Sequence, residues 1–137
     1  MTSPSSSSFR PEVTTGGSVP IWLQVVRGVR LAVAQGRLTE GEAMPSVRAM
    51  AESLVVNPNT ISKAYAELTR ERTLVSQPGR GVFVAPPREV LSRREKTRRL
   101  AEAAEELVHA AVEVDADPAE VEAAVHEALA RLGVGAE

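Results

Sequence analysis

Three stretches of the chain place apolar residues at the spacing of an amphipathic helix. The first follows Pro20, ends at Gly36 and has its stripe at Ile21, Trp22, Val25, Val26, Val29 and Val33. The second begins after Ser46, a favoured N-cap, and has its stripe at Val47, Met50 and Leu54. The third begins at Pro58 after the N-cap Asn57 and has its stripe at Ile61, Ala64, Tyr65 and Leu68. The pattern predicts three short helices with buried apolar faces.

Two short strand-like runs, 74–76 and 82–84, follow the third helix. Residues 78–81 (Pro-Gly-Arg-Gly) lie between them and are typical of a tight turn that carries one cation. We therefore expect a β-hairpin with a basic tip. Ala85-Pro86-Pro87 comes next, and two prolines continue neither a strand nor a helix, so a domain boundary is predicted after Pro87.

Residues 88–137 carry two more amphipathic stripes. The first comprises Leu100, Ala104, Leu107, Val108 and Ala111, and the second comprises Val121, Val125, Ala128, Leu129 and Leu132. The second helix opens on Asp117-Pro118-Ala119-Glu120, which fits a capping box, and ends at Gly133. Two helices bury two such stripes poorly by themselves, so they need the first domain or a second copy of the chain. At the other end, serine-rich residues 1–17 are expected to form a disordered arm.

Composition excludes several classes of function. The 137 residues contain no cysteine, so disulfides, thiolate metal sites and cysteine nucleophiles are excluded. Aromatic residues make up 3% of the chain, too few for a binder that stacks several bases of a single strand. No apolar run reaches the length of a membrane helix and no secretory signal is visible, so we expect a cytoplasmic protein. We also expect no enzyme, because no nucleophile–base pair or phosphate loop is present.

Charge is divided unevenly along the chain. Residues 1–99 hold 15 Lys and Arg against 8 acidic residues, a net charge of +7, whereas residues 100–137 carry −9. A basic front half favours a polyanionic partner. The basic run Arg93, Arg94, Lys96, Arg98 and Arg99 is either a solvated helix face or a contact with flanking phosphates. His109 and His126 lie outside the apolar stripes with no carboxylate cluster, so no metal site is expected.

Helix, turn, helix and a basic-tipped hairpin, in that order, make up a winged helix-turn-helix. The major groove of DNA admits one helix, and the third predicted helix offers it a polar outer face. Asn59 is suited to a bidentate pair with adenine, Thr60 to a base edge or a thymine methyl, and Lys63 to a phosphate. On the preceding helix, Arg48 is placed to reach a guanine or a phosphate. Arg80 is placed to enter the minor groove from the hairpin.

Four motifs in register make residues 19–87 resemble the GntR family of bacterial transcription regulators. They are Pro-Ile-Trp-x-Gln (20–24), Gly-x-Leu-x-x-Gly-Glu-x-x-Pro-Ser-x-Arg (36–48), Asn-Pro-Asn-Thr-x-x-Lys-Ala-Tyr-x-Glu-Leu (57–68) and Pro-Gly-Arg-Gly-Val-Phe-Val (78–84). The short helical tail is similar to that of the YtrA subfamily. The resemblance implies a mainly α fold with a small β-hairpin: a winged helix-turn-helix over 18–87, then a two-helix dimerisation tail over 88–137.

What the resemblance implies about function is a homodimer that binds a palindromic double-stranded DNA operator. Such a protein represses its own operon and an operon encoding an ABC transporter. The family's DNA-contacting positions fall on Arg48, Asn57, Pro58, Asn59, Thr60, Ser62, Gly79 and Arg80. A small-molecule effector is compatible with the resemblance but has no support in the residues, and no cofactor or metal is implied.

The chain departs from the family pattern at several positions. Several relatives carry arginine where Pro58 and Ser62 stand, and Val82 replaces a common threonine. Arg72-Thr73 replaces a common Gly-Leu pair, so either the helix runs on or Arg72 takes a strained left-handed conformation. These departures leave an alternative function open, a winged-helix protein–protein adaptor that has lost DNA binding.

Overall fold

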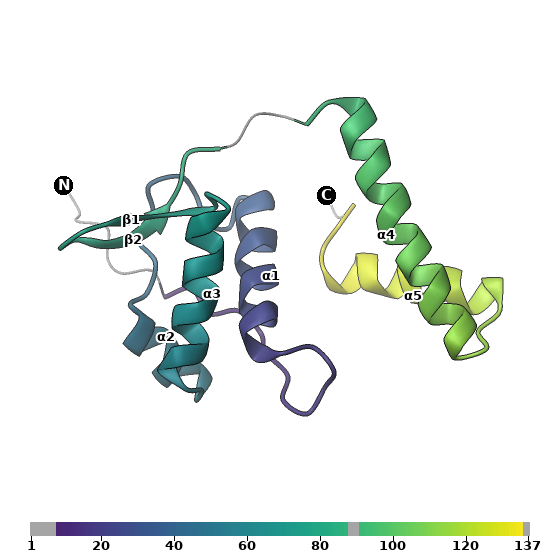
Figure 1. Ribbon diagram of the computed structural model, residues 1–137, viewed down its shortest axis with the longest axis horizontal. Helices are drawn as coiled ribbons and strands as arrows, with labels where there is room; N and C mark the ends of the chain where they lie inside the picture. The colour runs from purple at the N-terminus through teal and green to yellow at the C-terminus, as the bar shows by residue number, and fades with distance from the viewer. Residues whose placement is uncertain (1–7, 88–90, 136–137) are drawn as a thin grey trace. The chain divides into compact units, whose positions relative to one another are not determined.

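The computed structural model describes residues 8–87 and 91–135. Within them the fold is mainly helical with one small β-hairpin, as predicted (Figure 1). The chain divides into two compact units, Met1–Arg88 and Glu89–Glu137, which we call unit 1 and unit 2. Unit 1 contains α1 (Ile21–Ala34), α2 (Val47–Leu54), α3 (Pro58–Arg70), β1 (Leu74–Gln77) and β2 (Gly81–Val84); unit 2 contains α4 (Arg93–Glu113) and α5 (Pro118–Arg131).

Local capping chemistry sets the starts of α2 and α3. The Ser46 side chain accepts a hydrogen bond from the backbone N–H of Ala49 at 3.0 Å, and Asn57 accepts one from the N–H of Asn59 at 2.8 Å. Pro58 occupies the first turn of α3, as the sequence predicted. After α1, Gly36 adopts φ +75°, a conformation that glycine takes without steric cost.

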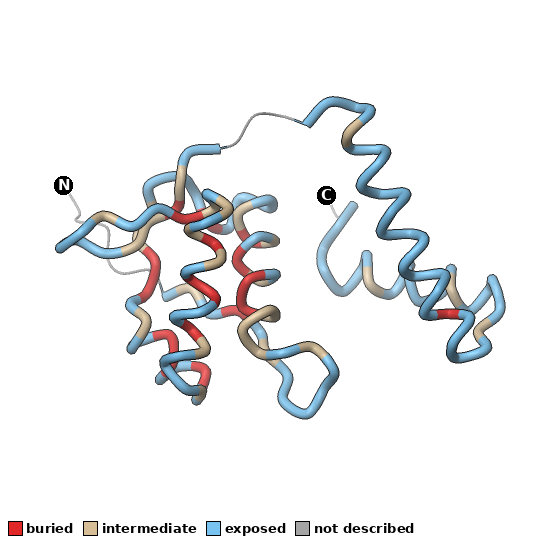
Figure 2. The backbone as a smooth tube through the Cα atoms, in the orientation of Figure 1, coloured by how far each residue is buried: buried red, intermediate tan, exposed pale blue. Residues whose placement is uncertain are grey.

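The core of unit 1 lies where α3 packs between α1 and α2 (Figures 1 and 2). The predicted stripe of α3 is buried along its whole length. The Tyr65 hydroxyl donates a hydrogen bond to the Pro45 carbonyl at 2.8 Å, so this polar atom is satisfied inside the core. Burial raises the pKa of this phenol. The buried apolar residues of unit 1 include Val25, Val26, Val29, Ala32, Leu38, Met44, Met50, Ala51, Leu54, Ile61, Ala64, Tyr65, Leu68, Leu74 and Val84.

The hairpin is held on both sides of β2. Strands β1 and β2 pair antiparallel, with Leu74 opposite Val84 and Gln77 opposite Gly81. The segment before α2 pairs with the other edge of β2, because the Gly41 N–H donates to the Val84 carbonyl at 2.9 Å. A backbone bridge joins Ala43 to Phe83 on the same edge. The hairpin base is therefore fixed to the helical core, and its tip is left as a projecting wing.

Residues 8–19 form a strap on α1, which corrects the prediction of a disordered arm over 1–17. Pro11 is buried and rests on Gly28, while Phe9 and Val13 pack against the core. The Gln24 side chain accepts from the Thr14 N–H at 2.7 Å and donates to two backbone carbonyls of the strap at 2.9 Å. The apolar residues of the strap do not recur at helical or strand spacing, so the sequence pattern did not predict their contacts with the core. Residues 1–7 lie outside the described residues.

Unit 2 is a pair of capped helices with little buried surface. Ser92 caps α4, and Asp117 and Glu120 form the predicted capping box at the start of α5. Ala111 is the only buried apolar residue in the described part of this unit. The exposed large apolar residues include Leu100, Leu107, Val108, Val112, Val125, Leu129 and Leu132. Each helix therefore keeps an apolar stripe that unit 2 does not cover by itself.

Candidate nucleic-acid interface

The first turns of α3 present a polar surface to solvent. Asn57, Pro58, Asn59 and Ser62 are exposed, and Thr60 is half-buried. The Asn57 carbonyl oxygen is occupied by its capping bond, which leaves its amide N–H groups for an outside partner. The Asn59 side chain makes no hydrogen bond to the described residues. Its amide therefore keeps both the donor and the acceptor that a bidentate adenine contact needs.

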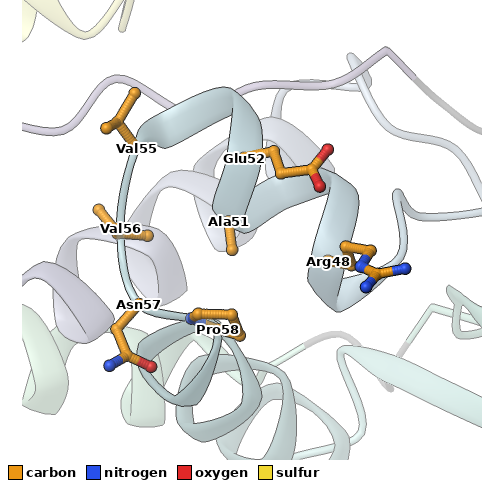
Figure 3. A pocket seen from close by; sticks show the side chains of 7 residues that line it. All are labelled: Arg48, Ala51, Glu52, Val55, Val56, Asn57 and Pro58. Atoms are coloured by element: carbon orange, nitrogen blue, oxygen red, sulfur yellow. The ribbon is translucent and has the colours of Figure 1, made fainter.

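A shallow groove joins α2 to the start of α3 (Figure 3). Three residues predicted to contact DNA line it: Arg48, Asn57 and Pro58. Arg48 is exposed, and no carboxylate of the described residues lies within ion-pair distance of its guanidinium. The remaining lining residues are Ala51, Glu52, Val55 and Val56. The structure thus brings the α2 cation next to the N-terminus of the third helix.

The groove includes two residues that the sequence reasoning missed. Glu52 lies one helical turn after Arg48, and its carboxylate is suited to accept from a cytosine amino group. Val55 is 88% exposed and adopts φ +56°, ψ +53°, a left-handed conformation that is rare for a β-branched residue. Glu52 could have been predicted from the sequence, because it lies four residues after Arg48 and so on the same face of the helix. The left-handed backbone of Val55 has no signal in the sequence.

The wing tip combines glycine turns with one cation. Gly79 and Gly81 adopt φ +76° and +126°, conformations in which a side chain would be strained. Arg80 is exposed between them, and its guanidinium carbon lies 6.0 Å from the centre of the Phe83 ring. This distance is at the outer limit of a cation–π contact, so the cation remains available at the tip.

Lys63, predicted to be a phosphate anchor, is exposed and also contacts an aromatic ring of α1. Its ammonium lies 4.4 Å from the centre of the Trp22 ring on α1, within cation–π distance. Trp22 is half-buried against the core, and its ring face is covered by this lysine. Lys63 therefore lies on the α1 side of α3, whereas Arg48 lies on the helix that packs against the other side.

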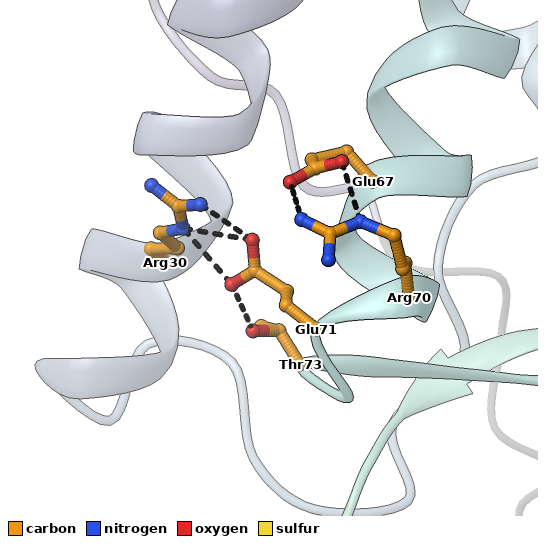
Figure 4. A network of polar contacts seen from close by, with 5 residues as sticks. All are labelled: Arg30, Glu67, Arg70, Glu71 and Thr73. Atoms are coloured by element: carbon orange, nitrogen blue, oxygen red, sulfur yellow. Dashed lines mark hydrogen bonds and ion pairs between the residues drawn. The ribbon is translucent and has the colours of Figure 1, made fainter.

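Ion pairs fix the C-terminal end of α3 (Figure 4). Arg30 of α1 donates to both carboxylate oxygens of Glu71, at 2.5 to 3.1 Å, and the Thr73 hydroxyl donates to the same group at 2.8 Å. The hydrogen bond that Arg30 donates to Glu71 raises the pKa of Arg30. Within α3, Arg70 pairs with Glu67, and this hydrogen bond lowers the pKa of Glu67. These contacts attach the third helix and the start of the wing to α1.

Arg72 follows this cluster in a left-handed conformation, with φ +67°. The Thr73 N–H donates to the Leu68 carbonyl at 2.9 Å, which closes the helix end. Of the two alternatives for this position, α3 stops at Arg70 and Arg72 takes the strained conformation.

A family model described as "Bacterial regulatory proteins, gntR family" matches residues 22–84, which span α1 to the end of β2. Residues 22–84 therefore form a GntR-family helix-turn-helix domain. The HTH-type transcriptional repressor YtrA of Bacillus subtilis (strain 168) is 35% identical over 74 residues, which cover 54% of this chain and 57% of that protein. The chain thus spans about three fifths of the length of the curated relatives that it first matches.

Solved structures share the fold. A transcriptional antiterminator from Listeria monocytogenes EGD-e aligns over 97% of both chains with a TM-score of 0.74 and 30% identity. The DNA-binding domain of AraR, crystallised in complex with the operator ORX1, aligns over 56% of this chain and 99% of that one, with a TM-score of 0.51 and 27% identity. The relatives are named as transcriptional regulators and not as enzymes.

The described residues do not support a metal site or a membrane-spanning helix. His109 and His126 are exposed, and no group of three His, Asp or Glu side chains in residues 8–87 and 91–135 is arranged to hold a metal ion. No helix in that part of the chain is long and apolar enough to cross a membrane. The polar N-terminal half of α3, with Arg48 and the wing, therefore remains the candidate site.

Proposed function

We propose that the protein is a sequence-specific regulator of transcription in the cytoplasm that binds double-stranded operator DNA. The N-terminal half of α3 lies in the major groove, where Asn59 and Thr60 read base edges. Asn57, Pro58 and Ser62 lie against the adjoining backbone. The observation that carries this proposal is that the exposed Arg48, which pairs with no carboxylate in residues 8–87 and 91–135, lies beside the polar start of α3.

The wing adds a second contact in this arrangement. Arg80 enters the minor groove, and Gly79 lets the backbone approach the phosphates closely. Lys63 reaches a phosphate only by leaving the ring of Trp22, so we assign it a weaker contribution than Arg48. The AraR domain, which shares this fold, was crystallised with its operator, and this supports DNA as the partner.

Unit 2 serves as the dimerisation tail in this proposal. Its uncovered apolar residues, which Leu100, Leu107, Val112 and Leu129 exemplify, are 37–73% exposed in the single chain. A second copy of the same helices covers them by two-fold symmetry. A two-fold dimer recognises a palindromic operator whose half-sites lie about 10 bp apart, one helical turn.

The similarity to the YtrA repressor extends the proposal to the regulated genes. We propose a YtrA-type repressor of its own operon and of an operon encoding an ABC transporter. Footprinting on DNA upstream of its own gene tests this: a protected palindrome supports it, and binding no tighter than to random duplex contradicts it.

Two alanine variants test the interface. Arg48→Ala and Asn59→Ala should each weaken operator binding by about 10- to 100-fold, because a good base contact contributes about 1–3 kcal/mol. Arg27→Ala removes an exposed cation from α1 and serves as the matched control, with little expected change. If both interface variants bind as the unaltered protein does, the adaptor function becomes the better account.

A further inference from the structure

The first turn of α4 carries three cations that have no carboxylate partner among the residues that the structure describes. Arg93, Arg94 and Lys96 are all exposed. Five ion pairs are found in residues 8–87 and 91–135, and none involves these side chains. We call these three residues the basic cluster.

Neighbouring acidic residues are already committed to other arginines. Glu95 accepts from Arg98 and Arg99, and the Arg98 hydrogen bond, followed by that of Arg99, lowers the pKa of Glu95 to about 2. Glu102 pairs with the remaining arm of Arg98 at 2.5 Å. The basic run of the sequence therefore divides into two sets. Arg98 and Arg99 form ion pairs with acidic residues of α4, whereas the basic cluster forms none with the described residues.

The position of the basic cluster is unfavourable for the isolated helix. The N-terminus of a helix is the positive end of its dipole, and each cation there costs about 0.3–1 kcal/mol when exposed. Acidic side chains are preferred in a first turn, and α4 has only Glu95 there. A bound polyanion removes this repulsion, because phosphate oxygens satisfy both the cations and the helix end.

Chain connectivity limits how far the basic cluster can lie from the end of β2. Eight residues lie between Val84, the last residue of β2, and Arg93, and an extended chain over these nine Cα-to-Cα steps spans at most about 32 Å. This is less than one turn of DNA, about 34 Å. A duplex held by α3 and the wing therefore offers phosphates within reach of the basic cluster.

We propose that Arg93, Arg94 and Lys96 bind the sugar–phosphate backbone of operator DNA outside the base pairs read by α3 and the wing. The proposal rests on the proposed function, since it needs DNA at unit 1. It gives unit 2 a second role, in which the tail that pairs two copies also lengthens the DNA contact of each copy.

The experiment compares three full-length proteins: the unaltered chain, R93Q/R94Q/K96Q and the matched control R98Q/R99Q. Fluorescence anisotropy gives operator affinity between 50 and 200 mM salt, and hydroxyl-radical footprinting gives the protected length. Each lost phosphate contact lowers the salt slope by about 0.9, so loss of the six contacts that two copies make lowers it by about 5.4. The affinity ratio between the unaltered protein and the triple variant should therefore be on the order of 1,000-fold larger at 50 mM than at 200 mM salt, with protection lost only outside the base pairs read by α3 and the wing.

Three results overturn the inference. A triple variant with an unchanged slope and footprint shows that the basic cluster does not touch DNA, and it leaves the proposed function intact if the operator is still bound. An equal loss of slope per cation in R98Q/R99Q indicates a general charge effect and not a site. Failure of the unaltered protein to prefer its operator over random duplex ends the proposed function and this inference together.

Discussion

Gly28 lies in the middle of α1, where alanine is ordinarily the better residue. Replacing a glycine inside a helix by alanine stabilises it by roughly 0.5–1 kcal/mol. Here the added Cβ would lie 2.8 Å from the Cβ of Pro11, closer than two carbon atoms pack, and Pro11 is itself buried. Forcing a methyl group into such a contact costs about 1–3 kcal/mol. We therefore expect Gly28→Ala to lower the free energy of unfolding of unit 1, by no more than about 2 kcal/mol.

Removing the Pro11 ring should reverse the sign of this effect. In a Pro11→Gly background the space above Gly28 is empty, so Gly28→Ala should raise the free energy of unfolding by roughly 0.5–1 kcal/mol. The two single variants, the double variant and the unaltered chain form a double-mutant cycle. Its coupling energy equals the cost of the collision, about 1–3 kcal/mol.

Urea unfolding followed by tryptophan fluorescence measures all four proteins. Trp22 is the single tryptophan of the chain and lies in α1, so its signal reports on unit 1. Ala66→Gly, at an exposed position of α3, gives the ordinary cost of a helical glycine in the same protein. If Gly28→Ala stabilises the unaltered chain by that full amount, the strap does not pack on α1 and the reasoning is refuted.

Three further substitutions test other features of unit 1. Val55→Gly should raise the urea midpoint by an amount equivalent to about 1 kcal/mol, because it relieves a left-handed valine; an unchanged midpoint contradicts that conformation. Tyr65→Phe should lower stability by about 1–2 kcal/mol at pH 7, since it leaves the Pro45 carbonyl without its partner. The raised pKa of Tyr65 also means that the unfolded chain ionises first, so stability should fall as pH rises above about 10 and fall less in Tyr65→Phe. Glu71→Gln should lower the free energy of unfolding by up to about 1 kcal/mol, measured by a thermal melt, because Arg30 is partly exposed. An unchanged melting temperature would show that the ion pair gains nothing over solvation of the two separate charges.

The elements that the sequence predicted best are those whose ends depend on local chemistry. Ser46, Asn57 and Asp117 cap their helices through side-chain bonds to N–H groups two or three residues away. Such bonds need no knowledge of the tertiary structure, so a pattern of cap, proline and apolar stripe is enough to place the helix. The exposed positions of α3 follow from the same stripe, since the residues opposite a buried face are outside.

Features that depend on contacts between distant segments could not be predicted in this way. Pro11 packs on Gly28 across 17 residues, and neither residue shows a periodic pattern that would pair them. A helical wheel placed Lys63 on the outside, but the ring that it covers belongs to α1, and the packing of α1 on α3 is a tertiary fact. The split of the basic run into paired and unpaired cations likewise required side-chain geometry.

The contrast between the two units bears on how the proposed regulator would respond to concentration. Unit 1 closes its core within one chain, so it needs no partner to fold. In unit 2, the apolar stripes of α4 and α5 are uncovered. Burial of apolar surface contributes about 25 cal/mol per Å², and two isolated helices bury too little of it to be stable. If dimerisation supplies the missing burial, then folding of the tail and pairing of the chains are one event. Operator binding, which needs both half-sites, then shares the same dependence on protein concentration.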